Sequence, residues 1–194
     1  MERLIASEIA DEIIDLLLSN GGSEYIGEPV TKLEHMVQSA EIAAEKGFGE
    51  DLILAALLHD IGHICVPTTE YNNMSGLGLQ DHELLGATFL QSRGFSDRVI
   101  QAVALHVPAK RYLCYKYPDY LALLSEASLQ TLAYQGGPMT AYEAEVFEQN
   151  PYLEDIIAIR RIDEAAKIEN KPLPESLDEY KQMMVRHLQK SQIE

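Results

Sequence analysis

Apolar residues recur at helical spacing along most of the chain. In residues 2–19 they return every three to four positions, which is the pattern of an amphipathic helix. Asn20-Gly21-Gly22 then breaks the pattern, as glycines do at helix ends. The same reasoning predicts further helices at residues 29–46, 50–60, 82–93, 96–106, 118–135 and 150–168, with a short helix from about 140 and a last one from about 176.

Residues that cap or break helices mark several of these boundaries. Asp81 and Ser96 each precede a helical segment, so both are predicted N-caps. Pro108 is expected to end the preceding helix near residue 106, because the residue before a proline avoids helical backbone. Two capping boxes are predicted from a hydroxyl followed three residues later by glutamate: Thr140 with Glu143, and Ser176 with Glu179.

No segment shows the alternation of apolar and polar residues that marks a strand, and no internal repeat is present. The predicted fold class is therefore all-α, a compact multi-helix arrangement. A length of 194 residues fits a single domain over residues 1–194. Residues 64–80, rich in Thr, Asn and Gly, are expected to form a long loop, and we hypothesise that this loop is a lid.

Charge and composition narrow the class of partner. With 31 acidic and 15 basic residues the net charge is −16, whereas nucleic-acid binders carry basic patches. Neither nucleic acid nor an acidic membrane surface is therefore an expected partner. The two cysteines form no CxxC motif, the N-terminus does not resemble a signal peptide, and no apolar run reaches the roughly 20 residues that span a bilayer. We expect a cytoplasmic protein.

The segment around His59 carries the first sign of chemistry. An apolar run over residues 54–58 ends in His59-Asp60, and His63 follows one helical turn later. Imidazole and carboxylate are common ligands of iron, manganese and zinc. An isolated pair of this kind is more typical of a buried helix end whose side chains bond each other. Gly62, between the histidines, would allow the helix to end or another backbone to approach.

Regular spacing of the histidines favours a metal site. From 35 to 59 is 24 residues, from 59 to 82 is 23, and from 82 to 106 is 24. Helices that return to one end of a bundle at such intervals can bring four imidazoles together, as metal-binding bundles do. With Asp60 and Asp163 these are too many ligands for one tetrahedral zinc. The set predicts two octahedral metals, with Asp60 as the bridge: His35, His59, Asp60, His82, His106 and Asp163.

The other two histidines are predicted to lie outside this ligand set. His63 is expected beside the metals as a donor that faces the substrate, because the ligand set is already full. His187, close to Arg186 and Lys190 on the last helix, is expected at the solvated surface.

The metal-ligand pattern resembles the HD-domain superfamily, whose members are all-helical metal proteins and mostly phosphohydrolases. The additional histidines at 82 and 106 resemble its binuclear branch, which holds phosphodiesterases and mixed-valent di-iron oxygenases. Four segments further resemble the 2-amino-1-hydroxyethylphosphonate dioxygenase family, relatives of myo-inositol oxygenase, within a likeness that spans about residues 23–188: residues 25–28, 106–112, 134–139 and 160–163.

That resemblance implies O2-dependent cleavage of the carbon–phosphorus bond of (R)-2-amino-1-hydroxyethylphosphonate, giving glycine and phosphate. It implies two iron ions, in a mixed-valent Fe(II)/Fe(III) state, on the six predicted metal ligands. Tyr25 and Glu28 would form a mobile gate, with Glu28 meeting the substrate amine, and His63 would join them as a catalytic residue. The phosphonate ligands would be His63, Lys110, Ser128 and Arg160.

The positions of two cations agree with an anionic substrate. Arg160 is three residues from Asp163 on one predicted helix, and Lys110 is four residues beyond His106. Guanidinium suits phosphoryl oxygens as a fork, and ammonium suits them as a point charge. In a chain with net charge −16, local cations are needed to attract a phosphonate.

Other functions stay open at this point. A trimethylammonium analogue, cleaved to glycine betaine, would favour an aromatic cage, for which Tyr25, Tyr71 and Tyr112 are available. An HD phosphohydrolase would use its metal to lower the pKa of a bound water. A degenerate HD domain acting as a nucleotide sensor would gain nothing from a complete ligand set. The oligomeric state is not determined, and a monomer is compatible with the sequence.

Overall fold

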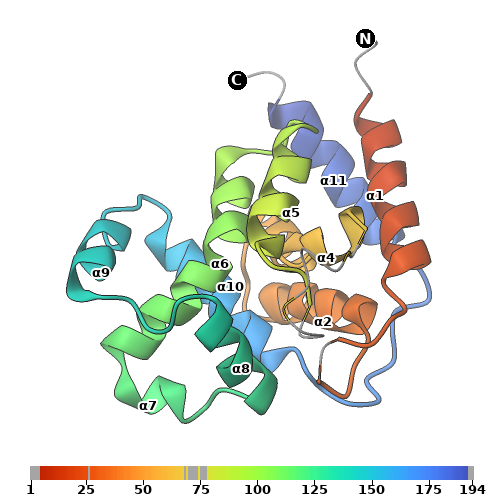
Figure 1. Ribbon diagram of the computed structural model, residues 1–194. Helices are drawn as coiled ribbons and strands as arrows, with labels where there is room; N and C mark the ends of the chain where they lie inside the picture. The colour runs from red at the N-terminus through yellow and green to blue at the C-terminus, as the bar shows by residue number, and fades with distance from the viewer. Residues whose placement is uncertain (1–4, 26, 68, 70–73, 75–77, 192–194) are drawn as a thin grey trace.

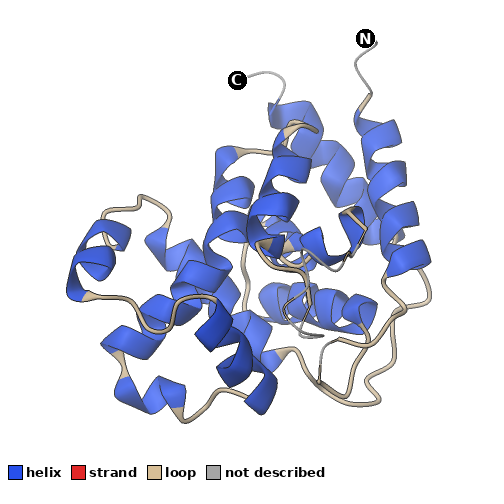
Figure 2. Ribbon diagram, viewed as in Figure 1, coloured by secondary structure: helices blue, strands red, loops and turns tan. Residues whose placement is uncertain are grey.

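The computed structural model describes residues 5–25, 27–67, 69, 74 and 78–191, to which every structural statement below refers. The all-α prediction is confirmed, since this part of the chain forms helices and no strand (Figure 1, Figure 2). The helices are α1 (Ala6–Asn20), α2 (Lys32–Glu45), α3 (Glu50–Leu58), α4 (Gly62–Cys65), α5 (His82–Gln91), α6 (Asp97–Lys116), α7 (Pro118–Leu121), α8 (Glu126–Tyr134), α9 (Ala141–Phe147), α10 (Leu153–Ala165) and α11 (Asp178–Ser191).

Two clusters of buried apolar side chains form the interior. The larger one lies among α1 to α6, α10 and α11, where α2 packs on α3 and the first helix packs on the last (Figure 1). The smaller one lies beneath α7 to α9. The helix α6 contributes to both, Val99 and Val103 to the larger cluster and Ala109 and Leu113 to the smaller. The single domain over residues 1–194 stays a prediction. The sharing of α6 between the two clusters supports it.

The helix α6 continues through Pro108 to Lys116, so the predicted end near residue 106 is wrong. A proline inside a helix removes one hydrogen bond and costs about 3 kcal/mol. Val107 and Ala109 on either side are buried, and the helix beyond them packs into the smaller cluster. Tertiary packing therefore outweighs the local preference of the proline. The predicted helix at 118–135 is instead divided into α7 and α8, and α10 is shorter than expected.

The second helix begins later than predicted because a threonine caps it. Thr31 Oγ1 accepts the backbone N–H of Glu34 at 3.2 Å, and the Glu34 carboxylate accepts the N–H of Thr31 at 2.6 Å. This capping box fixes the start of α2 at Lys32 rather than at Pro29.

The predicted caps have mixed outcomes. The capping box of Thr140 and Glu143 is confirmed at the start of α9. Asp81 precedes α5 as predicted, but it has left-handed backbone (φ 56°) and its side chain makes no capping bond. Ser176 lies two residues before α11 and accepts the N–H of Asp178 at 3.4 Å, so the second predicted capping box is wrong.

His187 is buried, at 4% exposed, although it was predicted at the surface. Its Nε2 accepts the backbone N–H of Ser96 at 3.1 Å, and its Nδ1–H donates to Asp51 Oδ1 at 3.0 Å. Ser96 is the N-cap of α6, as predicted, but its hydroxyl makes no capping bond. The imidazole satisfies that helix start instead, and it ties α11 to α3 and α6.

The expected loop at 64–80 begins after α4, the short helix that carries His63. Positions 68, 70–73 and 75–77 lie outside the described residues, and most of the proposed lid lies there with them. At the start of α4, a Cβ built on Gly62 would lie 1.9 Å from the carbonyl oxygen of His82 and 3.0 Å from the nitrogen of Gly86. Another backbone therefore does approach Gly62, as predicted.

We expect Gly62→Ala to lower the free energy of unfolding by at least about 3 kcal/mol, because its methyl group collides with rigid backbone. Gly22→Ala is the control, since a Cβ there has no neighbour within 4 Å, and its effect should stay within about 0.5 kcal/mol. Urea denaturation measures both. Equal effects of the two substitutions would contradict the close approach of α4 and α5.

Candidate functional site

The structure brings all six predicted metal ligands together in the interior, from helices that are distant in sequence. Each is at most 6% exposed. His35 comes from α2, His59 and Asp60 from the end of α3, His82 from the start of α5, His106 from the middle of α6 and Asp163 from α10.

The four imidazoles form two pairs. His35 Nε2 lies 3.0 Å from His59 Nε2, and His82 Nε2 lies 3.2 Å from His106 Nε2. The other ring nitrogen, Nδ1, of each of these four histidines lies 2.7 to 3.1 Å from a backbone carbonyl oxygen. A carbonyl only accepts, so Nδ1 carries the proton and Nε2 carries a lone pair. Facing lone pairs repel each other unless a proton or a metal cation lies with them, and carbonyls that fix the tautomer in this way are typical of metal-bound histidine.

Asp60 lies between the two pairs and presents one oxygen to each. Its Oδ2 is 3.5 Å from Nε2 of both His35 and His59, whereas its Oδ1 is 3.3 Å from Nε2 of His82 and 3.4 Å from Nε2 of His106. Asp60 Oδ2 is buried with no hydrogen-bond partner, which is rare for a carboxylate oxygen. These positions fit a carboxylate that bridges two metal ions.

The charges of the site also fit cations. Burial lowers the pKa of His59 to about 4, so a proton is not favoured on this imidazole near neutral pH. Burial by itself would raise the pKa of the Asp60 carboxyl, but His59, His106 and His82 outweigh it and hold this pKa well below its usual range. At Asp163 burial is outweighed in the same way by Arg160 and His35, so its pKa is also low. Both carboxylates are ionised.

The donor set suits iron. His82, His106 and Asp60 give two imidazoles and one carboxylate, which is the ligand set of non-haem Fe(II) oxygenases. At the other pair, Asp163 Oδ1 lies 3.3 Å from His35 Nε2 and 3.8 Å from His59 Nε2, which adds a second carboxylate. The residues present therefore fit two metal ions.

His63 also lies close enough to Asp60 and His82 to join a metal site. However, its Nδ1 accepts the backbone N–H of Leu79 at 3.4 Å, so in the neutral ring Nε2 carries the proton. Burial, together with His82, lowers the pKa of His63 well below its usual value, which keeps the ring neutral. The ring stacks on His82 at 3.9 Å, and Nε2–H is available as a donor.

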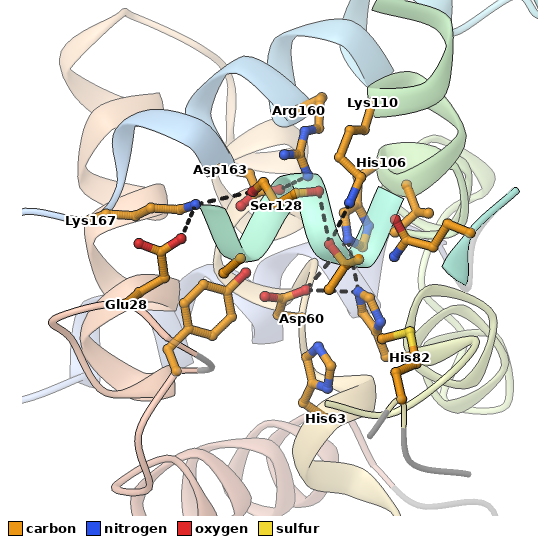
Figure 3. A pocket seen from close by; sticks show the side chains of 16 residues that line it. Glu28, Asp60, His63, His82, His106, Lys110, Ser128, Arg160, Asp163 and Lys167 are labelled. Atoms are coloured by element: carbon orange, nitrogen blue, oxygen red, sulfur yellow. Dashed lines mark hydrogen bonds and ion pairs between the residues drawn. The ribbon is translucent and has the colours of Figure 1, made fainter. Parts of the chain in front are cut away.

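A pocket reaches this centre (Figure 3). All six residues predicted to meet the substrate line it: Tyr25, Glu28, His63, Lys110, Ser128 and Arg160. Two of them are buried cations, Lys110 at 2% and Arg160 at 3% exposed. Lys110 Nζ donates to Thr131 Oγ1 at 2.9 Å, and burial, with Arg160 nearby, lowers its pKa to about 7. Arg160 forms an ion pair with Asp163, so it lies beside a candidate metal ligand.

The two residues of the predicted gate have fixed partners in this structure. The Tyr25 ring stacks on His35 with 4.1 Å between ring centroids, and burial and the Asp60 charge raise its pKa well above the usual value. Glu28 Oε1 accepts from Ser125 Oγ at 2.6 Å and from Lys167 Nζ at 2.7 Å. The mobility of the gate stays a prediction.

The aromatic cage receives little support. Of the described tyrosines, Tyr25 alone lines the pocket. Tyr112 packs in the smaller apolar cluster and donates to Glu148 at 2.7 Å, and Tyr71 lies outside the described residues.

Lys167 is a pocket residue that the sequence analysis did not identify. A signal was present, because Arg160, Asp163 and Lys167 are spaced by three and four residues, as on one helical face. Thr131 and Gln135 also line the pocket, but nothing in their sequence context distinguishes them from other surface residues of a helix.

Comparison with known proteins places this chain in a family. The family model of the HD domain matches residues 33–147. The chain belongs to the HD-domain family. The predicted resemblance to HD-domain phosphonate oxygenases is confirmed. The chain matches the HD-domain model, and two of its relatives are named phosphonate dioxygenases.

The alignments with three relatives each cover most of this chain. The [1-hydroxy-2-(trimethylamino)ethyl]phosphonate dioxygenase (glycine-betaine-forming) of Leisingera caerulea is 44% identical over 90% of this chain and 88% of its own length. The hydroxymethylphosphonate dioxygenase of Gimesia maris is 40% identical over 84% of this chain and 81% of its own. An uncharacterized protein of Acanthamoeba polyphaga mimivirus is 41% identical over 98% and 86%. Among the described residues no helix is long and apolar enough to cross a membrane.

We expect the protein to bind two equivalents of ferrous iron per chain and Asp60→Ala to bind at most one, because both proposed sites share this carboxylate. Asp119→Asn, which changes an exposed carboxylate of α7, is the control and should keep both equivalents. Anaerobic loading followed by elemental analysis measures the content. Two equivalents retained by a folded Asp60→Ala variant would contradict the bridge.

Proposed function

We propose that this HD-domain protein is a di-iron oxygenase. It uses O2 to cleave the carbon–phosphorus bond of (R)-2-amino-1-hydroxyethylphosphonate, which gives glycine and phosphate. The observation that carries the proposal is the pair of buried cations, Lys110 and Arg160, in a pocket that reaches a donor set for two metals. The names of two relatives support a phosphonate as the substrate class.

Four side chains would bind the phosphonate group. Arg160 would offer guanidinium N–H donors to the phosphonate oxygens, and Lys110, on α6, would offer a point charge. Ser128 and the His63 Nε2–H add neutral donors on the pocket wall (Figure 3). Because the cations lie beside the candidate metal ligands, the phosphonate would be held with its carbon near the metals.

Two iron ions held by the six ligands would supply the activation of O2 and the oxidation of the substrate carbon. The chain positions the reactants around them. Asp60 would keep the two ions at a fixed separation, and the backbone carbonyls behind the imidazoles would keep each Nε2 directed at its ion. Tyr25, stacked over His35, covers one side of the centre, and Glu28 would receive the substrate amine.

Two other reactions are alternatives for this pocket. Cleavage of the trimethylammonium analogue to glycine betaine is supported by the Leisingera caerulea relative, although the pocket offers one tyrosine for a cage. Hydrolysis of a phosphate ester is the known alternative for a metal site of this kind, and it would require neither O2 nor a redox metal.

We expect phosphate and glycine from (R)-2-amino-1-hydroxyethylphosphonate in air, and neither under argon, when the protein is loaded anaerobically with ferrous iron. Equal phosphate release under argon would mean hydrolysis and would contradict an oxygenase. Release only from the trimethylammonium analogue in air would keep the chemistry and correct the substrate.

The lowered pKa of Lys110 predicts a pH effect on phosphonate binding. The ammonium is charged below about pH 7 and loses its proton as the pH rises through 7, so its contribution to anion binding falls. Because phosphonates titrate as well, we compare wild type with Lys110→Met at each pH. Wild type should bind about tenfold more tightly at pH 6 and about twofold or less at pH 8.

Calorimetric titration under argon measures these affinities. Lys116→Met is the control, since Lys116 lies on the same helix and pairs with Glu148 outside the pocket. If the ratio of phosphonate affinities between wild type and Lys110→Met does not change with pH, Lys110 does not titrate in this range.

A further inference from the structure

The pocket contains an ion pair that metal binding does not explain. Glu28 and Lys167 are joined at 2.7 Å, and their side chains are 9% and 13% exposed. Ser125 Oγ donates to the same Glu28 oxygen at 2.6 Å, and Lys167 Nζ lies 3.4 Å from the hydroxyl oxygens of Ser125 and Ser128. Figure 3 shows Glu28 and Lys167 side by side at the pocket wall.

Glu28 is the pocket carboxylate that remains for a substrate cation. Three carboxylates line the pocket, and Asp60 and Asp163 face the histidines and Arg160. Lys167 already holds Glu28 through a short, largely desolvated contact. A substrate amine that reaches Glu28 must therefore compete with an ammonium group of the protein itself.

We propose that Lys167 is a specificity-determining residue whose ammonium occupies the position of the substrate amine at Glu28. The proposal rests on the function proposed above and identifies how the same pocket distinguishes among phosphonates. Lys167 gives up Glu28 only to a group that can replace its hydrogen bond.

Three classes of phosphonate differ in whether they can replace the hydrogen bond of Lys167 to Glu28. A hydroxyphosphonate without an amine leaves the Glu28–Lys167 pair intact. A primary ammonium brings three N–H donors and can take the place of Lys167. A trimethylammonium group brings positive charge but no N–H, and its methyl groups hold the nitrogen away from the carboxylate. The pair therefore favours primary amines over trimethylated ones, and it weakens amine binding relative to a protein without Lys167.

The test is the affinity of iron-loaded protein under argon for hydroxymethylphosphonate, 2-amino-1-hydroxyethylphosphonate and the trimethylammonium analogue. In Lys167→Met the preference for the primary amine over hydroxymethylphosphonate should rise about tenfold, because the internal competitor is gone. Lys167→Arg should restore the wild-type preference. Lys171→Met, which removes a similar lysine paired with Glu41 outside this pocket, should leave it unchanged.

The ratio of the affinities for 2-amino-1-hydroxyethylphosphonate and hydroxymethylphosphonate distinguishes this role of Lys167 from simple attraction of the phosphonate group. If Lys167 only attracted phosphonate, both ligands would weaken alike and the preference would not change, which would overturn the proposal. A wild-type preference for the trimethylammonium analogue over the primary amine would overturn it as well. If Lys167→Met does not fold, Lys167→Gln should show a smaller shift in the same direction, and no shift there counts against Lys167.

Failure of the proposed function gives a different result. If wild type binds none of the three phosphonates, the substrate class is wrong, and the role of Lys167 is overturned with it. If wild type binds them but the preference is the same in all variants, the substrate class stands and the role of Lys167 is overturned alone.

Discussion

The repulsion between facing imidazole lone pairs is the constraint on which the rest of this structure depends. Four backbone carbonyls fix the Nδ1 protons and so direct four Nε2 lone pairs at one another. The ionised Asp60 between them adds negative charge. A proton or a metal cation between the lone pairs relieves this repulsion, and helices from both halves of the chain must pack closely to hold the side chains in place. The apolar clusters around α3 and α6 provide that rigidity.

The negative charge of the whole chain makes the cations of the pocket important. A chain of net charge −16 repels a dianion at long range. Arg160 and Lys110 are buried next to the candidate metal ligands, where their charges are screened less by solvent than charges at the surface. A phosphonate bound there would meet two local cations that the composition of the protein does not reveal. Glu28 and Lys167 are neutral as a pair, so in the proposed role they would adjust selectivity without changing the net charge of the pocket.

The sequence predicted which six polar residues lie together better than it predicted the helix boundaries. Histidine spacing and the His-Asp pair can be recognised in the sequence without knowledge of the fold. The helix through Pro108, the burial of His187 and the pairing of Lys167 depend on contacts between residues far apart in sequence. Local rules assign a proline to a helix end and a histidine beside charged residues to the surface. Tertiary packing reverses both assignments.

The continuation of α6 through Pro108 bears directly on the proposed function. If α6 ended near residue 106, Lys110 would lie in a loop, and its position relative to the metals would vary. Because the helix continues through Pro108, His106 and Lys110 lie one turn apart on the same face. The packing of the smaller apolar cluster stabilises this continuation and so holds the Lys110 ammonium beside His106, a candidate metal ligand. The segment that holds α7 to α9 therefore contributes to the pocket twice, through Ser128 on the pocket wall and through the packing that supports α6 beyond Pro108.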